Sequence, residues 1–149
     1  MQFQRPATKT VTILLVDDDD IDAMGVERAL KKLKISNPIV RARDGVEALE
    51  LLERPDAVKA PFLILLDINM PRMNGFELLD ILRGHPTLSC SVVFVLTTSN
   101  DDQDKMAAYR KHVAGYIVKN KVEDGFMQLI QMLDHYWRVV EFPVSQSDE

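Results

Sequence analysis

The acidic run at residues 17–20 places four consecutive aspartates directly after the aliphatic residues ILLV. Two like charges 4 Å apart repel by about 4 kcal/mol near a protein surface, so carboxylates gathered in this way need a compensating interaction. A bound divalent cation would provide one, because hard cations prefer carboxylate oxygens. A solvated acidic patch would also account for the run, and so would a helix start, where aspartate favours the cap and first turn.

Five aliphatic runs alternate along the chain with segments of helical periodicity, and turn-forming residues separate them. The runs predict strands at residues 11–16, 39–42, 62–66, 92–96 and 115–118. Apolar residues at helical spacing predict five helices, marked by Ala23, Val26, Leu30 and Leu33, by Val46, Leu49 and Leu52, by Phe76, Leu79 and Leu82, by Met106, Tyr109 and Val113, and by Phe126, Leu129, Ile130, Leu133 and Trp137. Most runs are continuously apolar, which favours a parallel sheet covered on both faces, in a doubly wound α/β fold.

This architecture gives the aspartates a context. In open α/β sheets, ligands bind at the edge formed by the carboxyl ends of the strands. Four of the five predicted strands end in polar side chains, namely Asp17 and Asp18, Asp67, Thr97 and Thr98, and Lys119. Chance placement of the whole set at one edge is far rarer than chance placement of any one member. A functional site is therefore expected at this edge.

Composition narrows the possible functions. A chain of 149 residues, 46% hydrophobic and 28% charged, fits one globular domain, expected at residues 11–142 between an N-terminal arm (1–10) and a tail (143–149). The net charge of −5 and the lack of a basic cluster argue against a nucleic-acid partner. The longest apolar runs are too short to cross a membrane and no signal peptide is visible, so a cytoplasmic protein is expected. A single cysteine, Cys90, excludes an internal disulfide and is assigned no function.

The chain closely resembles the receiver domains of two-component response regulators. The resemblance spans about residues 12–133 and rests on four motifs in order, LLVDDDD, LLDINMPRMNG, VLTTS and GYIVKNK. The second motif is quite specific, whereas the acidic pair or the lysine alone would be weak. The resemblance implies a flavodoxin-like receiver fold with five parallel strands in the order 2-1-3-4-5.

The resemblance also implies a phosphorylation site. Asp67 matches the aspartate that accepts a phosphoryl group from a phosphohistidine of a sensor histidine kinase. Mg²⁺ would be bound by the carboxylates of Asp18 and Asp67 and by the backbone carbonyl of Asn69, with Asp17 acting mostly through water. The next acidic residues, Asp19, Asp20 and Asp22, are instead expected to cap and charge the first turn of the first helix.

Three further residues receive roles from the same resemblance. Lys119 and the hydroxyl of Thr97 would contact the phosphoryl oxygens, and Tyr116 would be the aromatic switch that follows Thr97. Receivers usually have proline after the lysine, but here Asn120 follows Lys119. A cis bond before a residue other than proline costs about 2.5 to 4 kcal/mol, so a trans Lys119–Asn120 peptide is expected. The MPRMNG segment is expected to form a turn, in which Pro71 fixes φ and Gly75 permits a backbone conformation that is costly for other residues. Met73 is expected to fill a loop contact there.

The expected function is that of a stand-alone response regulator that phosphorylates and dephosphorylates itself and turns over no external substrate. The single-domain format and the ending DHYWRVVEFP resemble the response regulators of bacterial and cyanobacterial phytochrome kinases. Two alternatives remain. One is an interaction module that has lost the chemistry, although the Asp, Thr and Lys set is complete. The other is a Mg²⁺-dependent phosphatase, which typically has a second aspartate where this chain has Asn69.

The last helix predicts an assembly. A helix over residues 122–140 would be about 28 Å long, whereas a strand of five or six residues covers about 17 to 20 Å. The overhang of roughly 10 Å would expose an apolar patch. We expect a homodimer through the fourth helix, fifth strand and fifth helix, unless the N-terminal arm covers the patch instead. The expected interface residues are Met132, Tyr136, Trp137, Val139, Val140 and Phe142.

Overall fold

One parallel sheet organises the chain, which the computed structural model describes over residues 10–119 and 126–143. Its strands are β1 (Thr12–Val16), β2 (Ile39–Ala42), β3 (Phe62–Leu66), β4 (Val92–Thr97) and β5 (Gly115–Val118), in the order β2-β1-β3-β4-β5. Its helices are α1 (Asp20–Lys32), α2 (Gly45–Glu53), α3 (Gly75–Gly84), α4 (Asp102–Arg110) and α5 (Met127–Val139). The predicted fold class and strand order are confirmed.

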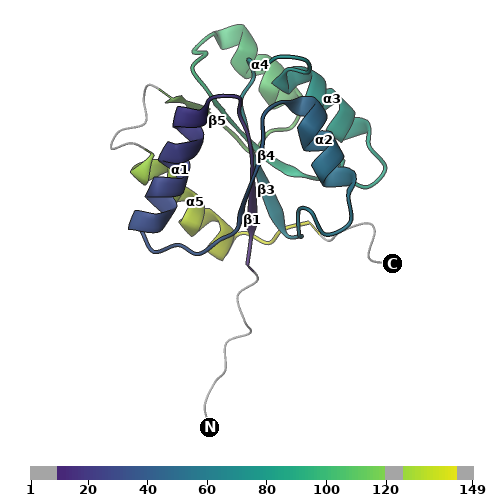
Figure 1. Ribbon diagram of the computed structural model, residues 1–149. Coiled ribbons are helices and arrows are strands. Elements are labelled where there is room, and N and C mark those ends of the chain that lie inside the picture. The colour runs from purple at the N-terminus through teal and green to yellow at the C-terminus, as the bar shows by residue number, and fades with distance from the viewer. Residues whose placement is uncertain (1–9, 120–125, 144–149) are drawn as a thin grey trace.

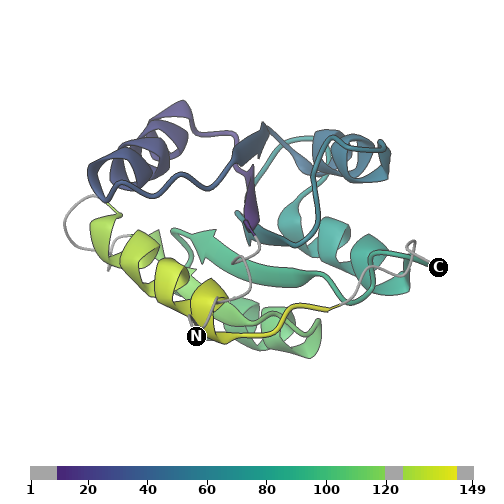
Figure 2. The same ribbon diagram turned by 90° about the horizontal axis from the view of Figure 1, so that it is seen from below.

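Helices cover both faces of the sheet, with α1 and α5 on one side and α2, α3 and α4 on the other (Figures 1 and 2). Alternation along the strands explains the two layers. In β3, Leu63 and Leu65 pack toward α1 and α5, whereas Ile64 and Leu66 pack toward the opposite helices. Helix layers bury both faces of β3, so every position of this strand is apolar.

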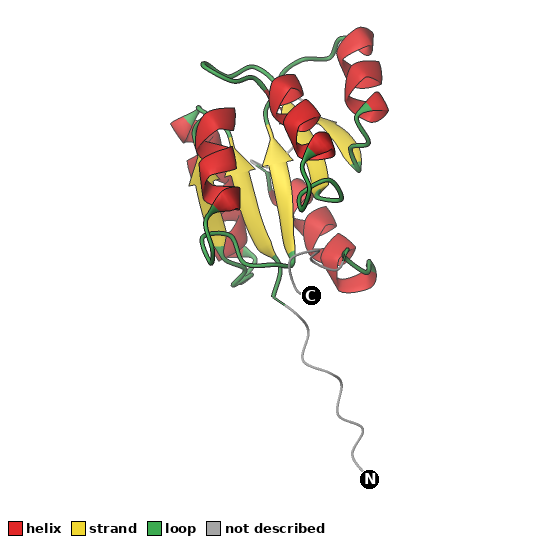
Figure 3. Ribbon diagram, turned by 90° about the vertical axis from the view of Figure 1, so that its right-hand side faces the viewer, coloured by secondary structure: helices red, strands yellow, loops and turns green. Residues whose placement is uncertain are grey.

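The strands run in one direction, so their carboxyl ends meet at a single edge (Figure 3). The register sets the relative heights of those ends. Leu66 lies opposite both Val16 and Val95, its neighbours in the sheet. The backbone pairing continues one residue further, because the amide of Asp67 donates to the carbonyl of Val16 at 2.9 Å. The polar residues that follow the strands are therefore brought to the same level.

The first turn of α1 contains the acidic residues that were expected there. Asp19 is the N-cap, and its Oδ1 accepts hydrogen bonds from the amides of Ile21 at 2.8 Å and Asp22 at 3.3 Å. The following residue, Asp20, pairs with Arg41 from β2. The cap satisfies amides that have no partner within the helix, so the acidic run is divided between helix capping and the edge of the sheet.

The predicted fourth helix is confirmed, but the apolar residues that marked it do not form its buried face. Met106 and Tyr109 are both more than half exposed. Val113 is buried but lies beyond the helix, which ends at Arg110. The small residue Ala108 makes the buried contact instead. The short apolar spacing was compatible with two faces of a nine-residue helix, and packing selected the other one.

The expected length of α5 is also wrong. The helix starts at Met127, because Phe126 has a left-handed backbone with φ of 75° and forms its N-cap. Its thirteen residues measure about 20 Å, close to the length of a strand, so the expected overhang of roughly 10 Å is lost. Residues 122–125, expected to form the first turn, lie outside the described part of the chain.

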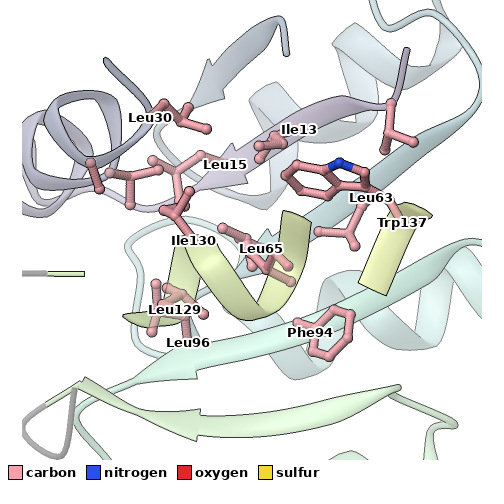
Figure 4. Close-up of a cluster of buried hydrophobic side chains, with 14 of the residues drawn as sticks. Ile13, Leu15, Leu30, Leu63, Leu65, Phe94, Leu96, Leu129, Ile130 and Trp137 are labelled. Carbon is pink, nitrogen blue, oxygen red and sulfur yellow. The ribbon is translucent and has the colours of Figure 1, made fainter. Parts of the chain in front are cut away.

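The aromatic residues near the end of α5 are largely covered by the chain itself. Trp137, an expected interface residue, is buried in the core that α1 and α5 form with the sheet (Figure 4). The ring of Tyr136 packs edge-on against Phe94 at a centroid distance of 5.1 Å, and Phe142 packs on Tyr136 at 6.0 Å. Val140, another expected interface residue, is exposed. The alternative cover, the N-terminal arm, falls largely on residues 1–9, which are outside the described range.

Across residues 10–119 and 126–143, no helix combines the length and apolar character needed to cross a bilayer.

Candidate phosphoryl-transfer site

The carboxyl edge of the sheet holds a cluster of three carboxylates. Oxygens of Asp17, Asp18 and Asp67 all lie within 4.8 Å of one another. Asp17 and Asp67 follow β1 and β3 directly and are buried, whereas Asp18 is exposed. Hard oxygen ligands that meet at one partly open position suit Mg²⁺, which usually keeps several waters. The residues present therefore fit a divalent metal site.

Burial makes the charged form of Asp17 costly. Its carboxylate is only 1% exposed, and burial raises its pKa because the charged form loses water. The ion pair with Lys119 and a hydrogen bond from the Asp19 amide oppose this effect but leave the pKa raised. A further cation at the cluster would favour the charged form. The electrostatics and the choice of ligand atoms thus agree on a site for a divalent ion.

Lys119 follows β5 and brings positive charge to this edge. Its side chain is 9% exposed, and its Nζ lies 2.6 Å from Asp22, 2.9 Å from Asp17 and 3.4 Å from Asp67. Burial alone would lower the pKa of the ammonium group, but the bonds to Asp22 and Asp17 outweigh burial and raise it. Lys119 therefore remains a cation beside Asp67 throughout the physiological pH range.

Two residues of this network were missed by the sequence analysis. Asp22 was assigned to the helix start alone, but its carboxylate is the nearest partner of Lys119. Arg41 was given no role, yet its Nε and Nη2 donate to the backbone carbonyl of Asp17 at 3.2 and 3.0 Å. Arg41 could have been found from the sequence, because it is a long charged side chain near the end of β2, and β2 is the neighbour of the strand that the acidic run follows. Helical side chains point back toward the N-terminus, which was the signal for Asp22.

The loop after Asp67 runs close beneath the site, and Gly75 is the reason that it fits. A Cβ at Gly75 would lie 2.6 Å from the carbonyl oxygen of Asp67 and 2.9 Å from the Cα of Ile68. The Gly75 amide also donates to the Ile68 carbonyl at 2.8 Å. The expectation that Gly75 permits a costly backbone conformation is wrong, since its φ lies outside the left-handed region. Close backbone approach requires glycine here.

A second contact holds the far end of the same loop. Arg72, with a left-handed φ of 62°, makes a two-pronged ion pair with the buried Asp44. Its Nε lies 2.6 Å from Oδ2 and its Nη2 lies 3.0 Å from Oδ1. The guanidinium of Arg72 lowers the pKa of Asp44. Met73 packs against Gly45, as a loop contact was expected to do. The segment after Asp67 is therefore tied to the start of α2.

The remaining predicted site residues lie along the same edge. Thr97 ends β4 and is fully buried, and its Oγ1 accepts a hydrogen bond from the Ser99 amide at 3.4 Å. Tyr116 is half-buried, and its hydroxyl donates to the Ser99 carbonyl at 3.0 Å. Burial raises the pKa of this phenol.

Asn69 is exposed, and its amide donates to Asp67 Oδ1 at 3.4 Å. Asn120, and with it the Lys119–Asn120 peptide, lies outside the described residues.

The arrangement is suited to moving a phosphoryl group. It places the buried carboxylate of Asp67 within an acidic cluster that fits a divalent ion and beside the cation of Lys119. The bound ion and Lys119 together could hold the oxygens of an anionic group. A cavity of about 870 Å³ lies elsewhere, at the amino ends of β3 and β4, where Phe62 and Val92 line it. The chemistry-bearing residues are therefore at the opposite end of the strands from this cavity.

Known proteins resemble this chain in sequence and in fold. The family model described as the response regulator receiver domain matches residues 13–131. The chain is 34% identical over 128 residues to the response regulator Rcp1 of Synechocystis, covering 84% of this chain and 87% of Rcp1. The solved Mn²⁺-bound form of Rcp1 has a TM-score of 0.78 at 33% identity, covering 90% of this chain and 99% of that one. The phosphorylated cyanobacterial phytochrome response regulator RcpA has a TM-score of 0.77 at 30% identity, covering 91% of this chain and 100% of that one.

Proposed function

Since the chain belongs to the response regulator receiver domain family, we propose that it is a signalling switch phosphorylated on Asp67 by a sensor histidine kinase. One observation carries this proposal: the buried Asp67, a member of the acidic cluster at the carboxyl edge of the sheet, lies beside Lys119. This is the combination that an anionic acceptor needs, because a carboxylate and a phosphoryl donor repel each other unless cations lie between them.

The proposed reaction is a direct transfer. A carboxylate oxygen of Asp67 forms a bond to phosphorus while the bond from phosphorus to the imidazole nitrogen breaks, and the imidazole keeps the electron pair. Water later attacks the acyl phosphate, which returns the carboxylate and releases inorganic phosphate. The protein thus modifies itself and turns over no external substrate.

In this proposal the acidic cluster binds the metal ion. Mg²⁺ held there supplies positive charge that reduces the repulsion between acceptor and donor. The carboxylates of Asp18 and Asp67 and the backbone carbonyl of Asn69 would bind the ion directly. Asp17 would act mostly through water, because its carboxylate is already bonded to Lys119 and to the Asp19 amide.

Three residues act on the transferred phosphoryl group or respond to it. Lys119 donates to the phosphoryl oxygens, since its ammonium group already lies beside the Asp67 carboxylate. The hydroxyl of Thr97 donates to the same group from the end of β4. Tyr116, whose hydroxyl now donates to the Ser99 carbonyl, transmits that change to the loop before α4.

Incubation with Mg²⁺ and acetyl phosphate tests the proposal. We expect intact-mass spectrometry to show one added phosphoryl group, lost on Asp67→Asn substitution and absent when a chelator removes divalent metal. Asp80→Asn is the matched control, because Asp80 is an exposed aspartate that pairs with Lys111 away from the site. A label that survives in Asp67→Asn would show that the acceptor is another residue. A wild-type protein that gains no label would favour the interaction module without phosphorylation.

The relatives support a proposal for the kind of kinase. RcpA is described as a phytochrome response regulator, and both it and Rcp1 match nearly the whole of this chain. We therefore place the partner among phytochrome-type sensor histidine kinases, which puts the protein in the cytoplasm. The Mg²⁺-dependent phosphatase is disfavoured, because its second acid would occupy the position of Asn69.

A homodimer remains part of the proposal, with a smaller apolar patch than expected from the sequence. On α5, Met132 and Val139 are exposed, as is Val140 directly after it. Met106 and Tyr109 add exposed apolar surface on α4. The two helices cover opposite faces of the sheet beside β5, its edge strand. A second copy packed on this edge would cover both groups.

Light scattering tests this assembly. We expect a dimer at roughly tens of micromolar and a monomer after Val139→Asp, which places a charge in the apolar patch. Ile21→Asp on α1 is the matched control, because Ile21 is 79% exposed and Val139 is 78% exposed. The control should remain dimeric. A wild-type protein that stays monomeric with and without phosphorylation would contradict the dimer.

A further inference from the structure

The ammonium group of Lys119 forms ion pairs with three carboxylates, only two of which belong to the acidic cluster. Asp17 and Asp67 belong to the acidic cluster that fits a divalent ion. Asp22 lies outside that cluster, in the first turn of α1, and its carboxylate is 2.6 Å from Nζ of Lys119. A lysine ammonium group has three N–H donors, so these three carboxylates are enough to occupy all of them.

The position of Asp22 is fixed by the fold. Its amide donates to the capping carboxylate of Asp19 at 3.3 Å. The next residue, Ala23, is buried against the sheet and anchors this turn of α1. The Asp22 side chain itself is only 19% exposed. Lys119 is held equally well, because it directly follows β5. The contact between Asp22 and Lys119 therefore joins two rigid elements rather than two flexible surface chains.

We propose that Asp22 is a positioning residue that holds Lys119 against α1 and competes with the phosphoryl group for its ammonium. This inference rests on the proposed function of Asp67. A metal ion bound by the cluster would share the charge of Asp17 and Asp67 and weaken their attraction for Lys119. Asp22 lies outside the cluster, so its hold on Lys119 persists when the site is loaded. Asp22 consequently slows the phosphorylation of Asp67.

The test compares three variants for the rate of phosphorylation by acetyl phosphate with saturating Mg²⁺. Asp22→Asn should be phosphorylated roughly three- to tenfold faster than wild type, the change that corresponds to losing one ion-pair contact of modest strength. Asp22→Glu keeps the carboxylate and should return the rate toward that of wild type. Asp20→Asn is the matched control, because it removes the same charge from the same turn but Asp20 pairs with Arg41 and Arg43. Its rate should stay close to wild type.

A second measurement needs neither metal nor phosphorylation. NMR relaxation of the side-chain ammonium groups in the metal-free protein should show Lys119 becoming more mobile in Asp22→Asn and not in Asp20→Asn. Unchanged mobility in Asp22→Asn would overturn the inference. So would an Asp22→Asn rate equal to or below that of Asp20→Asn. A wild-type protein that gains no label, with the mobility change still present, would instead reject the proposed function and leave the contact established.

Discussion

Replacing Gly75 with alanine is expected to destabilise the protein by about 2 to 3 kcal/mol, the cost of overpacking a tight site. The added Cβ would lie 2.6 Å from the carbonyl oxygen of Asp67 and 2.9 Å from the Cα of Ile68. Both atoms belong to the backbone, so no side-chain rotation relieves the contact. The start of α3 or the residue that accepts the phosphoryl group has to move.

The same displacement should slow phosphorylation of Asp67 by about 100-fold, because a shift of 1 Å in a reacting group costs about that much. Urea denaturation measures the loss of stability, and the rate of labelling by acetyl phosphate measures the loss of function. Gly84→Ala is the matched control, since it adds the same methyl group at the other end of α3, where nothing lies within 4 Å. The control should be neutral or slightly stabilised. A Gly75→Ala protein with wild-type stability and rate would show that the loop shifts freely.

The sequence alone was sufficient to predict the shape of the fold and the location of the candidate site. The third strand, FLILL, is apolar at every position, which indicates burial on both faces. Once parallel strands are inferred, a polar residue that directly follows a strand has to lie at the carboxyl edge. Asp67 and Lys119 come together for this reason although they are 52 residues apart in the chain. Their proximity follows from topology rather than from any local signal.

Further features depend on packing that no local pattern contains. The contact of Asp22 with Lys119 joins α1 to the end of β5, so it becomes visible only when the relative position of the two elements is known. Gly75 was recognised as a turn residue, but the atom that excludes a side chain there is the Asp67 carbonyl. The start of α5 was placed at residue 122 because Phe126 fits the apolar stripe of the helix, whereas the left-handed backbone of Phe126 makes the helix begin after it, at Met127. Periodicity cannot detect this.

Replacing Lys119 with methionine is expected to lower the stability of the metal-free protein by about 3 kcal/mol or more at neutral pH. The substitution keeps most of the volume of the side chain but removes the cation shared by Asp17, Asp22 and Asp67. Asp17 is affected most, because it is buried and its pKa is already raised by burial. An uncompensated buried charge costs more than the net value of the ion pair that it loses.

The pH dependence of this loss follows from the direction of the Asp17 pKa shift. Its pKa in the folded protein lies above the value in the unfolded chain, so the folded state binds the proton more tightly. The contribution of this group to stability therefore increases as pH falls through the folded pKa and decreases as pH rises through it. Lys119 opposes the upward shift, so its removal should raise the pKa of Asp17 further. The deficit of Lys119→Met should accordingly shrink in mildly acidic solution.

Mg²⁺ should distinguish this electrostatic cause from a loss of packing. A ligand stabilises the folded state according to its affinity. The cluster of Asp17, Asp18 and Asp67 should bind a divalent cation more tightly when Lys119 no longer contributes positive charge beside it. Mg²⁺ should therefore raise the melting temperature of Lys119→Met more than that of wild type. Lys111→Met is the matched control, because Lys111 pairs with the exposed Asp80, and such a pair contributes at most about 1 kcal/mol. If Mg²⁺ raises the melting temperatures of Lys119→Met and wild type equally, then lost packing rather than unbalanced charge destabilises the variant.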